Sequence, residues 1–361
     1  MVTDTDFMRR ALFHAGRAEG VTTPNPMVGA VIVSPDGVVV GQGRHPRAGG
    51  PHAEVFALEA AGDRARGATM YVNLEPCCHT GRTGPCTPRI IAAGIRRVVA
   101  AMRDPNPLVS GKGIDELRAN GVEVDVGLLG DEAQRLNRAF TLVQTEGRPM
   151  VIAKAAVSTD ARIAAAPGTR TQLTSAEANR RTQRIRAAVD AVGVGSGTLL
   201  SDDPVLTVRE VYRPRPLARV IFDRRLRTPS TARIFSTLKA GPVIIVTTAA
   251  SPGRDPDKAR ALAAAGATLL EGSGDLRQDL RELVRFDIST LLLEGGAMLH
   301  AAAWRADLID RVHVILAPTA LGESGVKFFD GIDVPASALI PVKVDRLGPD
   351  TWMEADVHGH R

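Results

Sequence analysis

The chain has 361 residues, a length that exceeds one typical domain and suits two. Its formal net charge is only +5 and its aromatic content is 4%, so neither a concentrated basic surface nor a base-stacking platform is indicated. No uncharged apolar run reaches the roughly 18 residues of a membrane helix, and the N-terminus lacks the apolar core of a secretory signal. We therefore expect a cytoplasmic protein without a membrane or nucleic-acid partner.

The first 147 residues alternate between helix-like and strand-like segments. In chain order we expect a helix at 7–18, strands at 28–33 and 38–42, a helix at 52–61, a strand at 69–74, a short helix at 88–93, a strand at 95–102, a helix at 113–120, a strand at 122–126 and a helix at 131–145. This alternation predicts an α/β sandwich of about 145 residues.

The sequence Gly147-Arg148-Pro149 predicts a domain boundary, so we expect one domain at 1–147 and a second at 148–361. After it we expect strands at 150–157, 191–195, 219–223, 243–248, 290–294 and 311–317, and helices at 175–190, 257–265, 276–285 and 297–304. Strands that alternate with helices indicate a mostly parallel sheet covered by helices.

The strongest chemical signal combines one histidine, one glutamate and two cysteines. His52 opens a predicted helix, Cys77 follows a predicted strand, and Cys86 precedes the next helix. One imidazole nitrogen and two thiolates suit tetrahedral zinc, and three protein ligands leave the fourth position open for water. Glu54 is two residues from His52, so it can reach that water as a general acid/base without binding the metal, the arrangement of zinc deaminases.

A structural zinc site is the alternative interpretation of this constellation. Structural sites usually have four protein ligands, and Cys78 is the remaining cysteine. Adjacent residues rarely present both thiolates to one tetrahedral ion, so Cys78 is interpreted as a non-ligand. A structural site also leaves Glu54 without a role.

Longer segments resemble a known family. PNPMVGAVIV (24–33), PHAEVFAL (51–58), LEPCCHTGRTGPC (74–86) and RDPNPLVSGKG (103–113) resemble the deaminase half of the bifunctional deaminase/reductase of riboflavin biosynthesis. KAAVSTDAR (154–162), LTSAEA (173–178), SDDPVLTVR (201–209) and LLLEGGAML (291–299) resemble its reductase half. The resemblance implies a cytidine-deaminase-like α/β/α sandwich followed by a dihydrofolate-reductase-like α/β domain.

For the first domain, the resemblance implies zinc-dependent deamination of 2,5-diamino-6-(5-phosphoribosylamino)pyrimidin-4-one. Zinc is held by His52, Cys77 and Cys86, and Glu54 carries the proton. Asn25 is implied to hydrogen-bond the substrate, and His79 and Arg82 to hold its phosphoribosyl end. Asp104 and Asn106 are weaker candidates, because a DPNP turn has a structural explanation of its own.

For the second domain, the resemblance implies reduction of the ribosyl group to ribityl with NADPH. Two groups of residues are implied. Those contacting the cofactor are Ala156, Thr198, Asp202, Arg224, Gly295 and Gly296, with Arg224 at the 2′-phosphate. Independently of the resemblance, the strand–glycine–helix junction at Gly295 and Gly296 is a candidate anion site, because backbone N–H groups at a helix start can bind a negative charge. Those lining the ribosyl-phosphate pocket are Lys154, Arg170, Arg186, Leu206, Arg209 and Glu294.

Some positions depart from the family pattern. Gly84-Pro85 replace two prolines before Cys86, Cys78 stands where a serine is common, and Ala161 replaces a usual glycine. Gln172 stands where some members carry an aromatic residue. Gly193, Gly195 and Gly197 form only part of a dinucleotide fingerprint and open no clear helix, so no Rossmann domain is expected.

Two competing functions remain at this point. A nucleobase deaminase with a C-terminal nucleic-acid-binding module predicts a basic stripe with interleaved aromatic residues. A non-catalytic protein with structural zinc leaves the reductase-like segments unexplained. For the favoured enzyme we expect a small-molecule substrate, namely a pyrimidine ribosyl phosphate, and a homo-oligomeric state.

Overall fold

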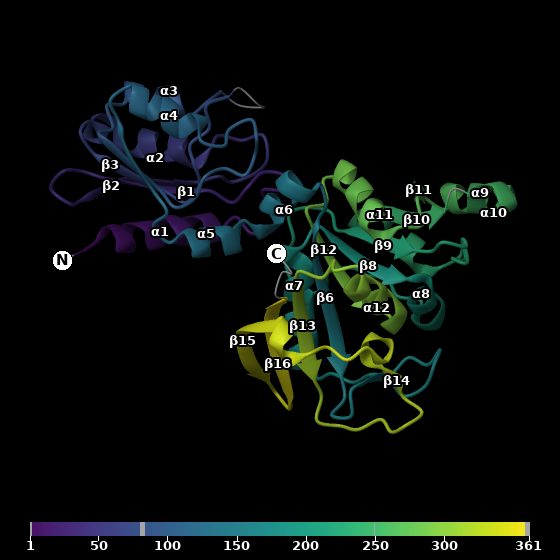
Figure 1. The fold of residues 1–361 in the computed structure, drawn as a ribbon. Coiled ribbons are helices and arrows are strands. Elements are labelled where there is room, and N and C mark those ends of the chain that lie inside the picture. Colours follow the sequence, from purple (N-terminus) through teal and green to yellow (C-terminus); the bar gives the residue numbers. More distant parts are fainter. Residues whose placement is uncertain (1, 80–83, 249, 358–361) are drawn as a thin grey trace. The chain divides into compact units, whose positions relative to one another are not determined.

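The computed structural model describes residues 2–79, 84–248 and 250–357. The chain divides into two compact units, Met1–Gly147 and Arg148–Arg361 (Figure 1). Among the described helices, none combines the length and the apolar character needed to cross a membrane.

The first unit is built on a five-stranded sheet in the order β2-β1-β3-β4-β5, in which β2 and β3 run antiparallel to β1 and the other pairs are parallel. Its elements are α1 (Asp4–Gly16), β1 (Gly29–Val33), β2 (Val39–Arg44), α2 (Ala53–Ala61), β3 (Thr69–Val72), α3 (Thr87–Ala92), β4 (Arg97–Ala100), α4 (Lys112–Ala119), β5 (Glu123–Val126), α5 (Gly130–Leu136) and α6 (Arg138–Glu146).

Helices cover both faces of this sheet (Figure 1). A Cβ atom added to Gly29 would lie 2.2 Å from the carbonyl oxygen of Ala11 in α1. On the opposite face, a Cβ atom at Gly43 would lie 2.4 Å from the carbonyl oxygen of Ala53 in α2. Glycine is therefore required where each helix lies directly on the strand backbone, and this close packing fixes the start of α2.

The helix expected at 131–145 is wrong as a single element. The structure has α5 and α6 instead, because Asn137 takes φ −100° and ψ 19° between them. The side chain of Asn137 accepts a hydrogen bond from the backbone N–H of Met27 at 2.8 Å and donates one to the Met27 carbonyl at 3.0 Å. The break is thus stabilised by a contact 110 residues away in sequence.

The second unit contains a nine-stranded sheet in the order β11-β10-β9-β8-β12-β6-β13-β16-β15. Its elements are β6 (Met150–Val157), β7 (Arg162–Ala164), α7 (Ala176–Ala188), β8 (Ala191–Gly195), α8 (Ser196–Asp202), β9 (Ala218–Phe222), β10 (Val243–Thr248), α9 (Ala250–Arg254), α10 (Pro256–Ala264), β11 (Ala267–Gly272), α11 (Leu276–Leu283), β12 (Thr290–Gly295), α12 (Ala297–Arg305), β13 (Arg311–Leu316), β14 (Val326–Lys327), β15 (Leu339–Leu347) and β16 (Asp350–Val357).

The mostly parallel sheet expected for this half is confirmed, since every pair from β11 to β13 is parallel. β16 and β15 extend it antiparallel. Val151 and Ala153 pack with residues of α11 and α12, whereas Ala156 packs with α7, so helices cover both faces of β6. One expectation is wrong: a helix, α8, does follow the glycines of β8.

A buried ion pair anchors the beginning of the second unit. The Arg148 guanidinium is 2.7 Å and 2.9 Å from the two carboxylate oxygens of Asp310, and the two residues are only 1% and 4% exposed. Asp310 also accepts a hydrogen bond from the backbone N–H of Val151 at 2.8 Å. The first residue of the unit is therefore fastened to the loop that precedes β13.

Candidate active sites

In the first unit, three potential metal ligands converge. His52 precedes α2 with an extended backbone, and its Nδ1 atom is 3.4 Å from the Cys77 Sγ and 3.3 Å from the Cys86 Sγ. All three ligand atoms lie within 4.8 Å of one another. Zinc at about 2.3 Å from sulfur and about 2.0 Å from nitrogen would separate tetrahedral ligands by roughly 3.6 Å. The residues present therefore suit a zinc ion.

The chain reaches this geometry despite the eight residues between the two cysteines. Cys77 follows β3, and Cys86 is the residue before α3. The backbone N–H of Cys86 donates a hydrogen bond to the Cys77 carbonyl at 2.9 Å. This bond holds the two ends of the intervening loop together, so both thiols lie at one site.

The protons of the three ligands are redistributed by their contacts. Its hydrogen bond with Cys77 raises the pKa of His52. A hydrogen bond from Cys86 lowers the pKa of Cys77, and the same bond together with burial raises the pKa of Cys86. Thiolates are the species that bind zinc, so metal binding at this site releases protons.

Glu54 lies beside the ligands on the first turn of α2. It is 3% exposed, and its Oε2 atom has no hydrogen-bond partner within the described parts of the chain. Burial raises the pKa of Glu54. A buried, unpartnered carboxylate oxygen is unfavourable unless a ligand or water completes it, as expected at a site that handles a proton.

Glu75 anchors the segment 104–114, a role that was not assigned from the sequence. Its carboxylate accepts hydrogen bonds of 2.9–3.2 Å from four backbone N–H groups, those of Asp104, Gly111, Gly113 and Ile114. The motif Glu75-Pro76-Cys77 thus combines a candidate metal ligand with an anchor for the segment 104–114.

Asn25 contacts His45, which the sequence analysis did not single out. Asn25 Nδ2 is 3.0 Å from His45 Nε2, and His45 Nδ1 is 3.0 Å from the Pro51 carbonyl. His45 is 2% exposed, and burial lowers its pKa. A neutral ring that donates to Pro51 can only accept at Nε2, so this contact orients the Asn25 amide with its oxygen directed away from His45.

The remaining substrate candidates of this unit differ in their placement. Arg82 lies outside the described residues. His79 is partly buried, with an Nδ1 atom that has no partner in the described chain. Asp104 accepts a hydrogen bond from the Asn106 N–H at 2.8 Å, the turn contact foreseen for DPNP, and burial raises the pKa of Asp104 to about 6.

In the second unit, Lys154, Arg186 and Glu294 form a partly buried cluster from β6, α7 and β12. The Arg186 Nε and Nη2 atoms are 2.6 Å and 2.7 Å from the two Glu294 oxygens. Burial opposes ionisation of Glu294, but Arg186 outweighs it and lowers the pKa of the carboxyl. Burial lowers the pKa of Lys154. One acid and two bases give the cluster a formal charge of +1.

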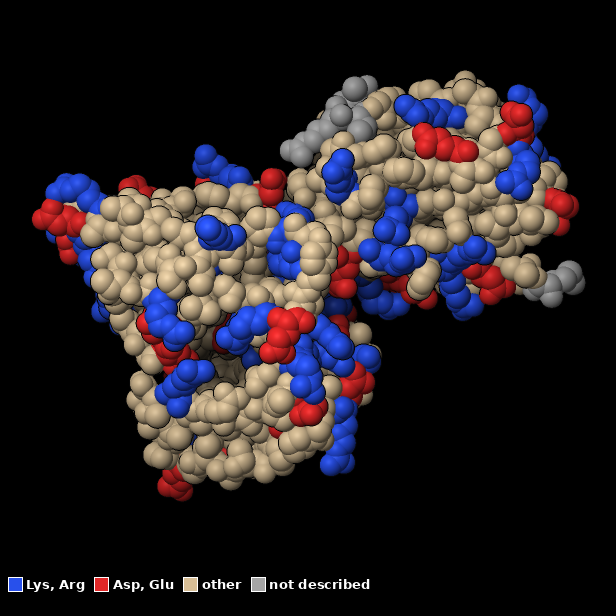
Figure 2. Space-filling view, turned by 180° about the vertical axis from the view of Figure 1, so that it is seen from behind, with Lys and Arg blue, Asp and Glu red and all other residues tan. Residues whose placement is uncertain are grey.

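The segment after α8 lines the same cluster. Arg186 Nη1 donates to the Thr207 carbonyl at 2.9 Å, and the Arg209 N–H donates to Gln183 Oε1 at 2.9 Å. Leu206 is 3% exposed and holds a left-handed backbone with φ 52°. Such strain at a buried non-glycine residue is typical of functional sites. Figure 2 shows Lys and Arg side chains, with acidic ones among them, around a hollow in this unit.

Three of the cofactor candidates, Thr198, Gly295 and Gly296, lie close together at the end of β12. A Cβ atom on either Gly295 or Gly296 would lie 3.0 Å from Thr198 Oγ1, so the glycines allow α8 to approach the end of β12. Asp202 ends α8 and accepts a hydrogen bond from Ser201, and Ala156 lies in β6. By contrast, Arg170 and Gln172 are exposed in the loop before α7, and no contact of theirs with this cluster is observed in the described structure.

Arg224 lines a cavity of about 410 Å³ at the carboxyl ends of β9 and β10. The other lining residues are Arg225, Thr248, Ser251, Arg254 and Asp255. The Thr248 and Ser251 hydroxyls donate to the Arg224 carbonyl at 3.1 Å and 2.5 Å, which fixes its backbone. Arg225, next to Arg224, and Arg254, in α9, were not singled out from the sequence, and for Arg254 no motif links it to Arg224.

Comparisons with known proteins identify the family of the chain. A family model of the RibD C-terminal domain matches residues 149–353, and one of the cytidine and deoxycytidylate deaminase zinc-binding region matches residues 1–102. The riboflavin biosynthesis protein RibD of Aquifex aeolicus is 42% identical over 351 residues, 96% of each chain. The chain belongs to the RibD family. The RibD protein of Escherichia coli is 40% identical, over 97% of this chain and 98% of its own.

Solved RibD structures share the fold. Acinetobacter baumannii RibD superposes with a TM-score of 0.87 at 37% identity, over 98% of both chains. A deaminase/reductase of Thermotoga maritima superposes with a TM-score of 0.84 at 34% identity, also over 98% of both chains. The expected fold and the expected bifunctional deaminase/reductase of riboflavin biosynthesis are confirmed, and the match at 149–353 disfavours a nucleic-acid-binding module there.

Proposed function

We propose that the unit 1–147 is the zinc-dependent deaminase domain and the unit 148–361 the NADPH-dependent reductase domain. The first acts on 2,5-diamino-6-(5-phosphoribosylamino)pyrimidin-4-one, and the second reduces the ribosyl group of the deaminated product to ribityl. The observation that carries the proposal is the pairing of two unlike sites: three zinc ligands beside an unpartnered Glu54 oxygen, and a cationic Lys154–Arg186–Glu294 cluster in the other unit.

In the deaminase site, His52, Cys77 and Cys86 hold zinc, which supplies a Lewis acid that lowers the pKa of water. Glu54 Oε2 would take one proton from the water and deliver it to a ring nitrogen, and would then carry the second water proton to the departing amine, which leaves as ammonia while the ring carbon keeps the oxygen. The Asn25 oxygen, oriented through His45, accepts a hydrogen bond from the pyrimidine. His79 and Arg82 contact the phosphoribosyl end.

In the reductase site, NADPH supplies the hydride that reduces the ribosyl carbon. The cluster charge of +1 attracts the anionic substrate, while Arg186 keeps Glu294 ionised and oriented. Lys154 donates a hydrogen bond to a ribosyl oxygen, and Leu206, Arg209 and Arg170 complete the pocket. Ala156, Thr198, Asp202, Gly295 and Gly296 contact the cofactor, and Arg224 binds its 2′-phosphate.

We also propose that the enzyme is cytoplasmic and homo-oligomeric, and that it acts on small molecules without a nucleic-acid or membrane partner. The low net charge and the absence of a long apolar run support the part of this proposal that concerns nucleic-acid and membrane partners.

The proposed function is tested by assaying each half-reaction in two variants. Glu54→Gln keeps the size and zinc but cannot carry a proton, so ammonia release should fall by about 10²–10⁴-fold while reduction of the deaminated substrate continues. Asp202→Ala should release ammonia normally and lose NADPH oxidation. Loss of both activities in Glu54→Gln with zinc and fold intact would contradict the assignment of two separate sites.

A further inference from the structure

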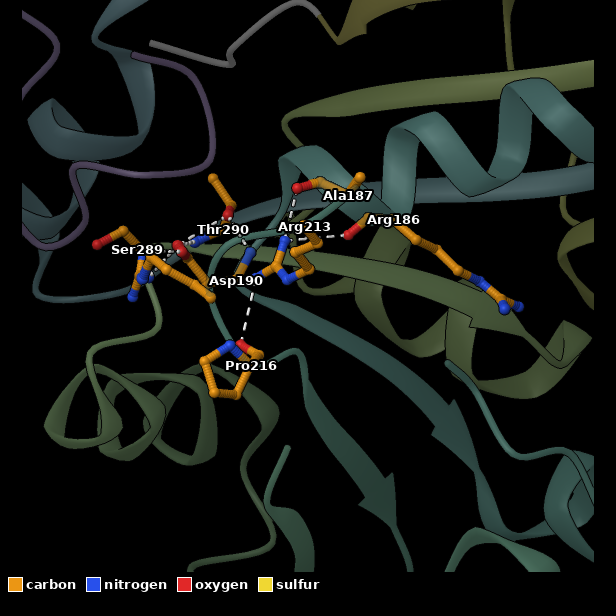
Figure 3. A network of polar contacts seen from close by, with 8 residues as sticks. Arg186, Ala187, Asp190, Arg213, Pro216, Ser289 and Thr290 are labelled. Carbon is orange, nitrogen blue, oxygen red and sulfur yellow. Dashed lines mark hydrogen bonds and ion pairs between the residues drawn. The ribbon is translucent and has the colours of Figure 1, made fainter. Parts of the chain in front are cut away.

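An arginine outside the proposed pocket caps the helix that carries Arg186. Arg213 lies in the segment between α8 and β9. Its Nη1 atom donates to the Ala187 carbonyl at 2.6 Å and to the Arg186 carbonyl at 3.3 Å, and its Nη2 atom donates to the Pro216 carbonyl at 3.4 Å (Figure 3). The last carbonyls of a helix have no partner within the helix, so the guanidinium supplies one and its charge suits the negative helix end.

The segment that carries Arg213 is attached along the last two turns of α7. Thr207 accepts from the Arg186 side chain, Arg209 donates its N–H to Gln183, and Arg213 then reaches the final carbonyls. Arg186 is thus held at both ends: its side chain by Glu294 and Thr207, and its backbone carbonyl by Arg213.

A second set of contacts ties the end of α7 to the start of β12. Asp190 follows α7, and its Oδ2 atom accepts hydrogen bonds from the N–H groups of Ser289 and Thr290 at 3.1 Å and 3.0 Å (Figure 3). The neighbouring Arg215 is 3.0 Å from Asp190 Oδ1. β12 runs from Thr290 to Gly295 and carries Glu294, so the two elements joined here are the two that hold the Arg186–Glu294 ion pair.

We infer that Arg213 is a positioning residue of the reductase: by capping α7 at Arg186 and Ala187 it sets the placement of the Arg186 guanidinium against Glu294 and the substrate. This inference rests on the proposed role of Arg186 in the ribosyl-phosphate pocket. Arg213 contacts three carbonyls through two separate nitrogens, and the single nitrogen of a lysine cannot reach all three. The full contact therefore requires the forked guanidinium of arginine. Burial lowers the pKa of Arg213 to about 10, so the side chain stays charged at neutral pH.

The experiment measures reductase kinetics in the full chain for Arg213→Met and Arg213→Lys. Displacing a substrate-binding group by a fraction of an ångström to one ångström costs up to about 100-fold, so we expect the KM for the deaminated ribosylamino substrate to rise roughly 10- to 100-fold in Arg213→Met. The kcat value should change much less, because the lost contact is made equally before and during the reaction. Arg213→Lys should lie between wild type and Arg213→Met.

A double-mutant cycle with Arg186→Lys separates a positioning role from general stability. If Arg213 acts through Arg186, Arg213→Met should add little to the KM of Arg186→Lys. Arg184→Met, at an exposed position of the same helix, is the matched control and should leave KM unchanged. The dissociation constant of NADPH, measured by fluorescence, should be unaltered in all variants and reports that the unit is folded.

The outcomes distinguish the inference from the function on which it rests. An unchanged KM in Arg186→Lys overturns the proposed role of Arg186 itself. A raised KM in Arg186→Lys with an unchanged KM in Arg213→Met, or with fully additive effects, overturns the positioning role alone. If Arg213→Met does not fold, Arg213→Lys takes its place in the cycle with the same criteria.

Discussion

Arg224, Arg225 and Arg254 bring three guanidinium groups to one cavity beside the hydroxyls of Thr248 and Ser251. A phosphate bound there would meet charged donors on more than one side, and the single Asp255 does not cancel them. On the proposed assignment of Arg224 to the 2′-phosphate, these residues, which come from the ends of two different strands, would distinguish NADPH from NADH.

Replacing Arg224 or Arg254 with glutamine should weaken this discrimination. Because a hydrogen bond to a charged group contributes about 1.5–3 kcal/mol, the kcat/KM for NADPH should fall roughly 10- to 100-fold. The value for NADH should stay the same, since that cofactor lacks the phosphate. Steady-state rates with both cofactors measure the effect, and Arg305→Gln, exposed at the end of α12, is the control. An equal loss of kcat/KM with both cofactors would contradict a role of these arginines in binding the 2′-phosphate.

Ala161 shows why one family position usually carries glycine. Its φ is 57°, in the left-handed region, and its N–H donates to the Ser158 carbonyl at 3.0 Å. An alanine tolerates this backbone at a cost of about 1–2 kcal/mol, which glycine avoids. The alanine at this position therefore occupies a turn whose left-handed backbone favours glycine. The residue identity alone does not reveal that backbone conformation.

At the level of elements, the zinc site depends on how closely α2 lies on β2. A Cβ atom at Gly43 would meet the Ala53 carbonyl oxygen at 2.4 Å and the Phe56 Cβ at 2.6 Å. Both atoms belong to the rigid first turn of α2, directly after the candidate metal ligand His52. The strand glycine is thus a condition for the position of the ligand.

Gly43→Ala should therefore displace the start of α2 and reduce the bound zinc well below one ion per chain. Overpacking of this kind costs about 1–3 kcal/mol, so the unfolding temperature of the first unit should also fall. Metal analysis and thermal unfolding check both effects, and NADPH oxidation by the second unit should persist. Gly16→Ala, where a Cβ would make only an ordinary 3.9 Å contact with Leu136, is the control. Full zinc occupancy in Gly43→Ala would refute the packing argument.

Sequence patterns predict the buried elements well. Strands at 150–157, 191–195 and 243–248 are predicted with the bounds that the structure has, because these runs are buried and strongly apolar. β15 and β16 were missed, since most of β15 is exposed and contains Pro341. The break between α5 and α6 depends on the distant Met27 backbone, which no local pattern contains.

For the candidate sites too, local sequence patterns predict some residues, whereas contacts between distant segments determine others. The zinc ligands and Glu54 follow from spacing and chemistry, and the structure brings the three ligands together. The supporting residues were missed, because their roles consist of contacts between segments: Glu75 with the loop at 104–114, His45 with Asn25, and Arg213 with the end of α7.

At the scale of the whole molecule, the two units differ in a way that allows them to be observed separately. The chain has two tryptophans, Trp304 and Trp352, and both lie in the second unit. Trp352 stacks on His313 with 5.4 Å between ring centroids. Tryptophan fluorescence therefore reports unfolding of the reductase unit alone.

Two buried histidines should make that unit sensitive to acid. Burial lowers the pKa of His300 to about 4 and that of His313 to about 3, below the unfolded value of 6.5. A depressed histidine pKa contributes stability that is complete above pH 6.5 and is lost as the pH falls towards the folded value, because the unfolded state binds the proton first. From pH 7 to pH 5 the loss should be about 2 kcal/mol for each histidine.

Denaturant unfolding followed by tryptophan fluorescence at several pH values measures this loss. His300→Gln and His313→Gln should each flatten the pH dependence by about half, whatever their stability at pH 7. A slope unchanged in both variants would assign the acid sensitivity to other groups.

The ion pair between Arg148 and Asp310 has a consequence for any attempt to divide this gene product into two half-proteins. A reductase polypeptide that begins at residue 150 would retain every strand of its sheet and yet leave Asp310 buried without its guanidinium partner. Removing one partner of a buried pair costs about 3–5 kcal/mol, a large fraction of the stability of a typical domain. Any division of the chain into two half-proteins must therefore lie before Arg148, so that Arg148 remains in the same polypeptide as Asp310.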